Sequence, residues 1–407
     1  MRRDGLVDGF VHRKVGIHDQ TLHLLAIRIA ERLAKKAAPG GTAGEPGNLY
    51  AGQGGVALFF SMYYRVSGED FFRRLALSLL EPYRARLLQR DGAERLVREQ
   101  GLGAAAGLGA ALYMLEKVAR LCGEAELMAD AGRLVERLTP ALLELDADFD
   151  LLYGSGGLIL PLLSLHDGMQ TEEPLAKAVM AGRFLVERRT AAENGLRAWR
   201  GRRISVMAGL LLTGFSHGAA GIAYALFKLY ERSGDEAFLA AGMEAVLYEQ
   251  SQFSREAGNW PDYRQTGEAV FQYANNWCHG APGIVLARIG GLAVADNPAI
   301  REEIEIGLKT LTADEQEATY DHLCCGEAGR LDVLMAAAQK LRRPHLYGRA
   351  RRRLEKMLWR SVERGKFLLP PAESRYKIGL FCGMAGIGYV LLRFLYPDKV
   401  PCVLLFE

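Results

Sequence analysis

Two kinds of apolar segment alternate along the chain. Segments such as ALFFSMYY at 57–64 and GIAYALF at 221–227 are apolar on nearly every side, whereas AFLAAGMEAVLYEQ at 237–250 is apolar on one side only. A helix that is apolar all round is buried, and a one-sided helix packs one face and exposes the other to solvent. The alternation predicts pairs of helices, one buried and one at the surface.

A short glycine motif, Gly-x-x-Gly followed by an apolar position, stands before each buried segment. Ser-Gly-acid turns at 67–69 and 233–235 end two of these segments, and their acidic residues favour the start of a second helix. Each repeat therefore predicts a glycine loop, a buried helix, a turn and an outer helix. The motif copies, the last of them looser than the others, are residues 52–56, 154–158, 218–222, 280–284, 326–330, 383–387 and 103–108.

Seven such repeats predict an all-α fold, an α/α toroid (barrel) of seven inner and seven outer helices. An open α-solenoid is the alternative, but open repeats rarely bury one helix of each pair so completely. No linker long enough to separate two domains interrupts the repeats. We therefore expect a single domain. Residues 1–47 supply an N-terminal amphipathic helix (18–36) and a loop that join the outer ring, and residues 48–407 form the toroid.

The composition excludes several classes of protein. Apolar residues make up 49% of the 407 residues, charged residues 24%, and the formal net charge is +3, so the chain can bury a core and has no basic excess for nucleic acid. The charge-free stretch 204–227 contains Ser, Thr and His side chains that are costly in lipid, so we expect no membrane span. Six cysteines and no signal peptide favour a cytoplasmic location.

Unusual residues directly precede four of the glycine motifs: Ser216-His217, Cys278-His279, Cys324-Cys325 and Cys382. In a toroid these positions are the starts of inner helices, which converge at one mouth of the barrel. Thiols and imidazoles gathered there favour one zinc ion, held by ligands from separate repeats. The alternative is that the cysteines are small core residues. That suits Cys122 and Cys402, but it does not suit an adjacent Cys-Cys pair at a helix start.

His217 and Asp150 are candidates for acid–base chemistry at the same mouth. An isolated buried histidine is more often a hydrogen-bonded core residue than a catalyst, but His217 lies one repeat from Cys278. Asp150, four residues before Gly154, has the corresponding place in another repeat. It could equally cap a helix, and Asp148 is a rival for its role.

The segments that contain these residues resemble the lanthionine synthetase C-like cyclases. They are 211–226, 276–284, 322–329 and 379–391, and segments 259–264 and 401–407 are similar to the cyclase half of the bifunctional type II lanthipeptide synthetases. The resemblance implies an α/α toroid with one Zn²⁺ that closes (methyl)lanthionine thioether rings in a dehydrated precursor peptide, leader plus core. In that reaction a peptide cysteine adds, in a Michael-type step, to dehydroalanine or dehydrobutyrine.

The resemblance also implies roles for single residues. The expected zinc ligands are Cys278, Cys324 and Cys325. His217 is the expected general acid/base, and Asp150 is its acidic companion. His279, directly after a ligand, is the second candidate for the acid.

The chain departs from the nisin-type members of the family at several positions. Those members have His in place of Cys325, so the site expected here is all-thiolate, which should leave the substrate sulfur more reactive. They also place Arg four residues before the first ligand and Tyr directly after it, where this chain has Ala274 and His279. The roles of that Arg and Tyr therefore do not transfer. Cys382 is expected to lie beside the ligands, or to be a ligand in place of one of the three.

Three functions compete on the sequence alone, and the first is the cyclase. The second is another α/α-toroid enzyme. A zinc thiol prenyltransferase should show Asp and basic residues for a diphosphate, and a glycosidase needs two carboxylates at the mouth. The third is a non-catalytic thiol- or peptide-binding module. Because 407 residues are too few for a dehydratase half as well, we expect an isolated cyclase domain or a stand-alone relative, with dehydratase as another domain or a partner.

Overall fold

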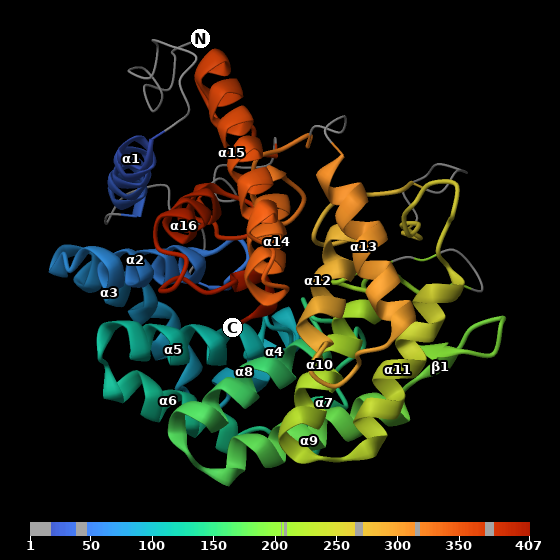
Figure 1. The fold of residues 1–407 in the computed structure, drawn as a ribbon. Coiled ribbons are helices and arrows are strands. Elements are labelled where there is room, and N and C mark those ends of the chain that lie inside the picture. Colours follow the sequence, from blue (N-terminus) through green and yellow to red (C-terminus); the bar gives the residue numbers. More distant parts are fainter. Residues whose placement is uncertain are drawn as a thin grey trace.

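The fold is a closed ring of helix pairs. The computed structural model describes residues 18–37, 47–204, 206, 210–264, 272–313, 318–370 and 378–407. In this part of the chain the regular structure is helical, apart from the hairpin of β1 (Thr190–Ala191) and β2 (Arg197–Ala198). Figure 1 shows the helix pairs following one another around the C-terminal end of the chain. The inner helices are α2 (Gln53–Ser67), α5 (Leu108–Cys122), α8 (Ser155–Met169), α10 (Ala219–Ser233), α12 (Ala281–Gly291), α14 (Glu327–Lys340) and α16 (Met384–Leu395).

Each inner helix contacts the next, α16 contacts α2, and each inner helix packs on one outer helix. The outer helices, in the order of their inner partners, are α3 (Asp70–Leu87), α6 (Ala125–Glu136), α9 (Glu172–Glu187), α11 (Glu236–Ser251), α13 (Pro298–Thr312), α15 (Pro344–Arg364) and α1 (Asp19–Ala37). Two further helices, α4 (Gly92–Gln100) and α7 (Pro140–Leu143), lie between pairs. The predicted α/α toroid of seven inner and seven outer helices is therefore confirmed for the described residues.

The N-terminal helix completes the outer ring. α1 covers the predicted 18–36 segment to within one residue at each end and packs on α16, the last inner helix. Most of the loop expected after it, residues 38–46, lies outside the described residues. No helix among the described residues is long and apolar enough to cross a bilayer.

The second glycine of each motif lets an inner helix begin against its own loop. At Gly221, a Cβ atom would lie 1.9 Å from the carbonyl oxygen of Phe215, six residues earlier. Any side chain there would force the first helical turn away from the loop, which explains why glycine recurs. The other six motifs have a close contact of the same kind: Gly55–Leu49, Gly107–Gly101, Gly157–Leu151, Gly283–Trp277, Gly329–Leu323 and Gly386–Leu380.

Hydrogen bonds join the glycine loops into a ring at one mouth of the barrel. Backbone amides and carbonyls link six of the seven neighbouring loop pairs, through Tyr50–Ala105, Ala104–Leu151, Leu152–Ser216, Ser216–Cys278, Cys324–Phe381 and Phe381–Tyr50 (donor first). The remaining pair is joined by the side chain of Asn276, whose amide NH₂, turned toward the carbonyls, donates to Cys325 O at 3.0 Å. The ring fixes the residues directly before each inner helix, which is where the cysteines stand.

The C-terminal segment fills the centre of the barrel. The hydroxyls of Tyr113, Tyr224 and Tyr389, from three inner helices, donate to backbone carbonyls within residues 401–407. The 3₁₀ helix η2 (Val403–Leu405) contacts α12 and α14. The ring of Phe406 lies 6.0 Å from that of Phe381, a residue of the last glycine loop. The C-terminal segment therefore occupies the interior of the barrel and reaches the last glycine loop.

Candidate metal centre and active site

Three thiols converge at the mouth. Cys278 lies in the loop before α12, and Cys324 and Cys325 lie in the loop before α14. Their Sγ atoms all lie within 4.8 Å of one another, with Cys278 to Cys325 at 3.1 Å and Cys325 to Cys324 at 3.4 Å. Cys278 and Cys324 are buried, and Cys325 is partly exposed. The structure thus brings together the three sulfurs that the sequence predicts as ligands.

Cys382 lies outside this group of three. It is buried, and its Sγ donates to the carbonyl oxygen of Tyr50 at 3.7 Å. Burial, together with the nearby thiol of Cys325, raises the pKa of Cys382 to about 12, so it stays a neutral thiol at neutral pH. Hydrogen bonds from Cys278 and Cys324 act in the opposite direction on Cys325 and lower its pKa well below the usual value. Of these two neighbouring thiols, Cys325 is the one that ionises readily.

His217 and Asp150 meet directly at the same mouth. Nδ1 of His217 lies 2.7 Å from Oδ2 of Asp150, and both side chains are nearly buried. The other carboxylate oxygen, Oδ1, accepts hydrogen bonds from the amides of Tyr153 (2.7 Å) and Gly154 (3.3 Å). Asp150 therefore holds the turn before α8 and orients the His217 ring. The rival Asp148 pairs instead with Arg203, at 3.0 Å.

Aromatic side chains stack on both the histidines of the mouth. The rings of Tyr153 and His217 are 5.6 Å apart, and those of His217 and His279 are 5.7 Å apart. His279 is fully buried, its Nδ1 lies 3.3 Å from Thr213 O, and burial lowers its pKa to about 4. Its imidazole is therefore neutral at pH 7. It has no exposed surface, whereas the side chain of His217 is 10% exposed at the mouth.

A buried glutamate that the sequence does not single out supports the loop that carries His217. Glu249, on α11, accepts hydrogen bonds from the amides of Gly214 (2.9 Å) and Ala220 (3.0 Å), on either side of the histidine. Its second oxygen accepts from Arg288 on α12 at 2.9 Å. Burial raises the pKa of Glu249 to about 6. The only sequence signal is an acidic residue on a helix face that is otherwise apolar.

A second ion pair lies beside the thiols. Arg264 donates from Nε to Asp262 Oδ1 at 2.9 Å and from Nη2 to Oδ2 at 2.5 Å. Burial lowers the pKa of Arg264, but the pairing with Asp262 and the nearby Cys278 and Cys325 thiols raise it by more, so the net shift is upward. Asp262 also lies 3.8 Å from Nδ1 of His279. In the sequence, only the resemblance of segment 259–264 to the family indicates that this pair matters.

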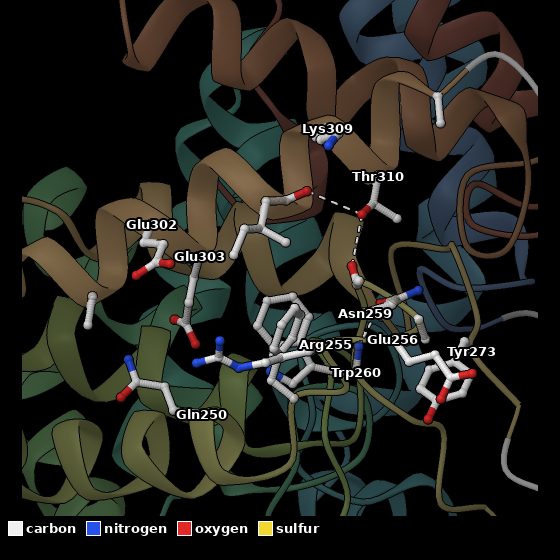
Figure 2. Close-up of a pocket in the computed structure, with 16 residues that line it drawn as sticks. Gln250, Arg255, Glu256, Asn259, Trp260, Tyr273, Glu302, Glu303, Lys309 and Thr310 are labelled. Carbon is white, nitrogen blue, oxygen red and sulfur yellow. Dashed lines mark hydrogen bonds between the residues drawn. The ribbon is translucent and has the colours of Figure 1, made fainter.

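Two cavities adjoin these elements. The larger, about 810 Å³, lies between the outer helices α11 and α13, with Trp260 and Glu303 among its lining residues (Figure 2). Asn259 lines this cavity and also accepts a hydrogen bond from Ala281 N, at the start of α12. The smaller, about 300 Å³, is lined by Tyr153 and lies at the mouth itself.

Fold and site together define a class, an α/α-toroid protein with three thiols at the mouth of its barrel that could hold a metal ion. Residues 45–405 match the family described as lanthionine synthetase C-like protein, and the chain belongs to that family. Membership confirms the resemblance seen in the sequence.

Two known proteins are similar to the chain. The lacticin 481/lactococcin biosynthesis protein LcnDR2 of Lactococcus lactis subsp. lactis is 25% identical over 194 residues, which cover 45% of this chain and 20% of that protein. The match thus spans about a fifth of the length of this relative. Nisin cyclase has the same fold, with a TM-score of 0.66 and 18% identity over 95% of this chain and 98% of its own.

Proposed function

We propose that the chain is a zinc-dependent peptide cyclase that forms (methyl)lanthionine rings. Its substrate would be a precursor peptide, leader plus core, in which Ser or Thr has already been dehydrated. The observation that carries the proposal is that three thiols and the His217–Asp150 pair meet at one mouth of the barrel. A module that only binds thiols would need the metal site but no acid beside it.

The donor set fits zinc. Sulfur ligands suit Zn²⁺ and not the hard cations Mg²⁺ and Ca²⁺. Three protein ligands, with no fourth His, Cys, Asp or Glu in the group among the described residues, are typical of catalytic zinc sites rather than structural ones. Cys278, Cys324 and Cys325 would hold the ion. When bound, zinc would act as a Lewis acid that keeps a substrate thiol ionised at neutral pH.

The residues of the chain would handle the proton in the reaction. The peptide thiolate forms a C–S bond to Cβ of the dehydro residue, and the electron pair of the C=C bond moves to the neighbouring carbonyl as an enolate. A proton must then reach Cα, and His217 would deliver it. Asp150 engages Nδ1 of that histidine, which leaves Nε2 for the substrate. Arg264 adds a positive charge close to the anionic sulfurs.

The setting of the reaction follows from the same groups. All six cysteines are free thiols, which suits a reducing compartment, and we infer a cytoplasmic location. The dehydro residues require a reaction that removes water from Ser or Thr, performed by a dehydratase domain or partner.

Metal analysis coupled to a cyclisation assay tests the proposal. The chain is incubated with a dehydrated, cysteine-containing precursor peptide, and loss of free thiol is followed at constant mass. We expect about one zinc per chain, Cys325→Ala to lose both zinc and cyclisation, and His217→Ala to keep zinc and lose cyclisation. Cys122→Ala is the matched control, because Cys122 is buried in the core at the end of α5. A zinc-loaded wild type that leaves the free thiol unchanged would refute the proposed function.

A further inference from the structure

The small cavity of about 300 Å³ lies one side chain away from His217. Tyr153, whose ring stacks on that of His217, forms part of its wall, together with Leu102 of the neighbouring glycine loop. Val97 on α4 and Leu145 after α7 also line it. The cavity is therefore built from the same loop ring that carries the thiols, and a peptide bound at the mouth can reach it.

The charged groups of the cavity are already paired with the protein. The carboxylate of Asp148 accepts hydrogen bonds from the backbone amide (2.8 Å) and from Nε (3.0 Å) of Arg203. Asp146 accepts hydrogen bonds from three backbone amides, and Arg98 binds Glu94 on its own helix. The cavity thus offers a ligand an apolar wall beside paired charges, with the side chains of Arg98 and Arg203 exposed.

Leu145 is an exposed residue of the apolar wall, and Arg203 is an exposed residue among the charged groups. Leu145 is 38% exposed, unusual for a large apolar residue in this chain. The guanidinium of Arg203 lies over the Tyr153 ring, 4.5 Å from its centroid, and its side chain is 44% exposed. Stacking and the Asp148 contact hold that group in place, while its remaining N–H groups can donate to a carbonyl.

We propose that this cavity is a substrate subsite that takes an apolar side chain next to the dehydro residue, with Arg203 donating to a main-chain carbonyl of the same peptide segment. The inference rests on the proposed function, since it assigns the occupant to the peptide that His217 would protonate. A cavity of this size, close to the lower limit of ligand sites, suits one side chain rather than a cofactor. The subsite would make the residue beside the dehydroalanine a determinant of which ring closes.

Two synthetic peptides test the subsite. Both contain dehydroalanine and a downstream cysteine, and they differ only in having leucine or glycine on both sides of the dehydroalanine. We expect wild type to cyclise the leucine peptide with a kcat/KM at least roughly tenfold higher. Leu145→Asp should reduce this preference, whereas Arg203→Ala should lower kcat/KM for both peptides alike, because both offer the same main-chain carbonyl. Zinc content should stay unchanged in both variants. Leu247→Asp is the matched control, because Leu247 is also exposed (47%) but lies on α11.

A binding measurement separates the subsite from the catalytic proposal. Fluorescent versions of both peptides with serine in place of cysteine cannot form a ring, and their affinity is read by anisotropy. Weaker binding of the leucine peptide to Leu145→Asp, but not to Leu247→Asp, would support the subsite. A wild type that binds in this way but fails to cyclise would refute only the proposed function. Equal preference for leucine over glycine in wild type and Leu145→Asp, in rate and in binding, would overturn the subsite.

Discussion

The two oxygens of Asp150 have separate partners, so one substitution can separate its two roles. Asn at position 150 keeps an oxygen for the amides of Tyr153 and Gly154, which Oδ1 accepts at 2.7 and 3.3 Å. It places an NH₂ group where Oδ2 meets Nδ1 of His217. Facing a donor, Nδ1 can only accept, so the imidazole would be held in the other tautomer and would lose the carboxylate that orients it.

The expected magnitudes differ for rate and stability. We expect Asp150→Asn to lower the rate of ring closure by roughly 10²- to 10⁴-fold, the usual contribution of a positioned acid. Its free energy of unfolding should fall by no more than about 1 kcal/mol, because the turn keeps its acceptor. Asp150→Ala should lose both functions, and its free energy of unfolding should fall by about 2–3 kcal/mol, since two nearly buried amides lose a charged acceptor.

Asn48 is the natural control for this experiment. It occupies the equivalent place in the first glycine loop, where its Oδ1 accepts from Ala51 N (3.0 Å) and Gly52 N (3.3 Å). Asn48→Ala should therefore destabilise the protein by about 1–2 kcal/mol and leave ring closure unchanged. Urea unfolding and thiol loss, measured on the same zinc-loaded samples, give both quantities. Wild-type rates in Asp150→Asn, or an equal loss of rate in Asn48→Ala, would refute the role assigned to the Asp150–His217 contact.

Three further predictions concern the metal, the glycine motif and acid stability. Cys325→His should keep zinc by metal analysis but close rings more slowly, because a neutral ligand leaves the substrate sulfur less electron-rich; an unchanged rate would contradict this. Gly221→Ala should lower the free energy of unfolding by about 3 kcal/mol in urea titrations, because the added Cβ would lie 1.9 Å from a backbone oxygen. Gly348→Ala on α15 is the control: its added Cβ would lie 3.9 Å from the nearest side-chain atom, so the change should be neutral or stabilising. The pKa of His279 is lowered from 6.5 to about 4 in the folded protein, so between these pH values the unfolded chain binds one more proton than the folded chain. The zinc-free protein should therefore lose about 3 kcal/mol of its free energy of unfolding as pH falls from 6.5 to 4. His279→Phe should flatten that loss in urea titrations across this range.

The repeating pattern determined most of the fold. Glycine motifs, buried segments and one-sided segments follow each other in local sequence, and each has a local cause: the close carbonyl contact at the second glycine, the apolar surface of the inner helix and the αL turn at Gly68 or Gly234. Seven such units bury their inner helices by closing on themselves, since α16 contacts α2. The order of the thiols before the helix starts is also visible in the sequence, because the motif fixes their register.

Tertiary structure decided the rest, for a physical reason. Asp148 and Asp150 are both acidic residues two positions apart, and only the packing of the 201–203 segment directs the first to Arg203 and leaves the second for His217. Cys382 shares the register of Cys325 but lies outside the group of three sulfurs. Hydrogen bonds and charges between residues far apart in the chain set these choices. Sequence alone could therefore indicate which residues reach the mouth, but not which of them would contact one another there.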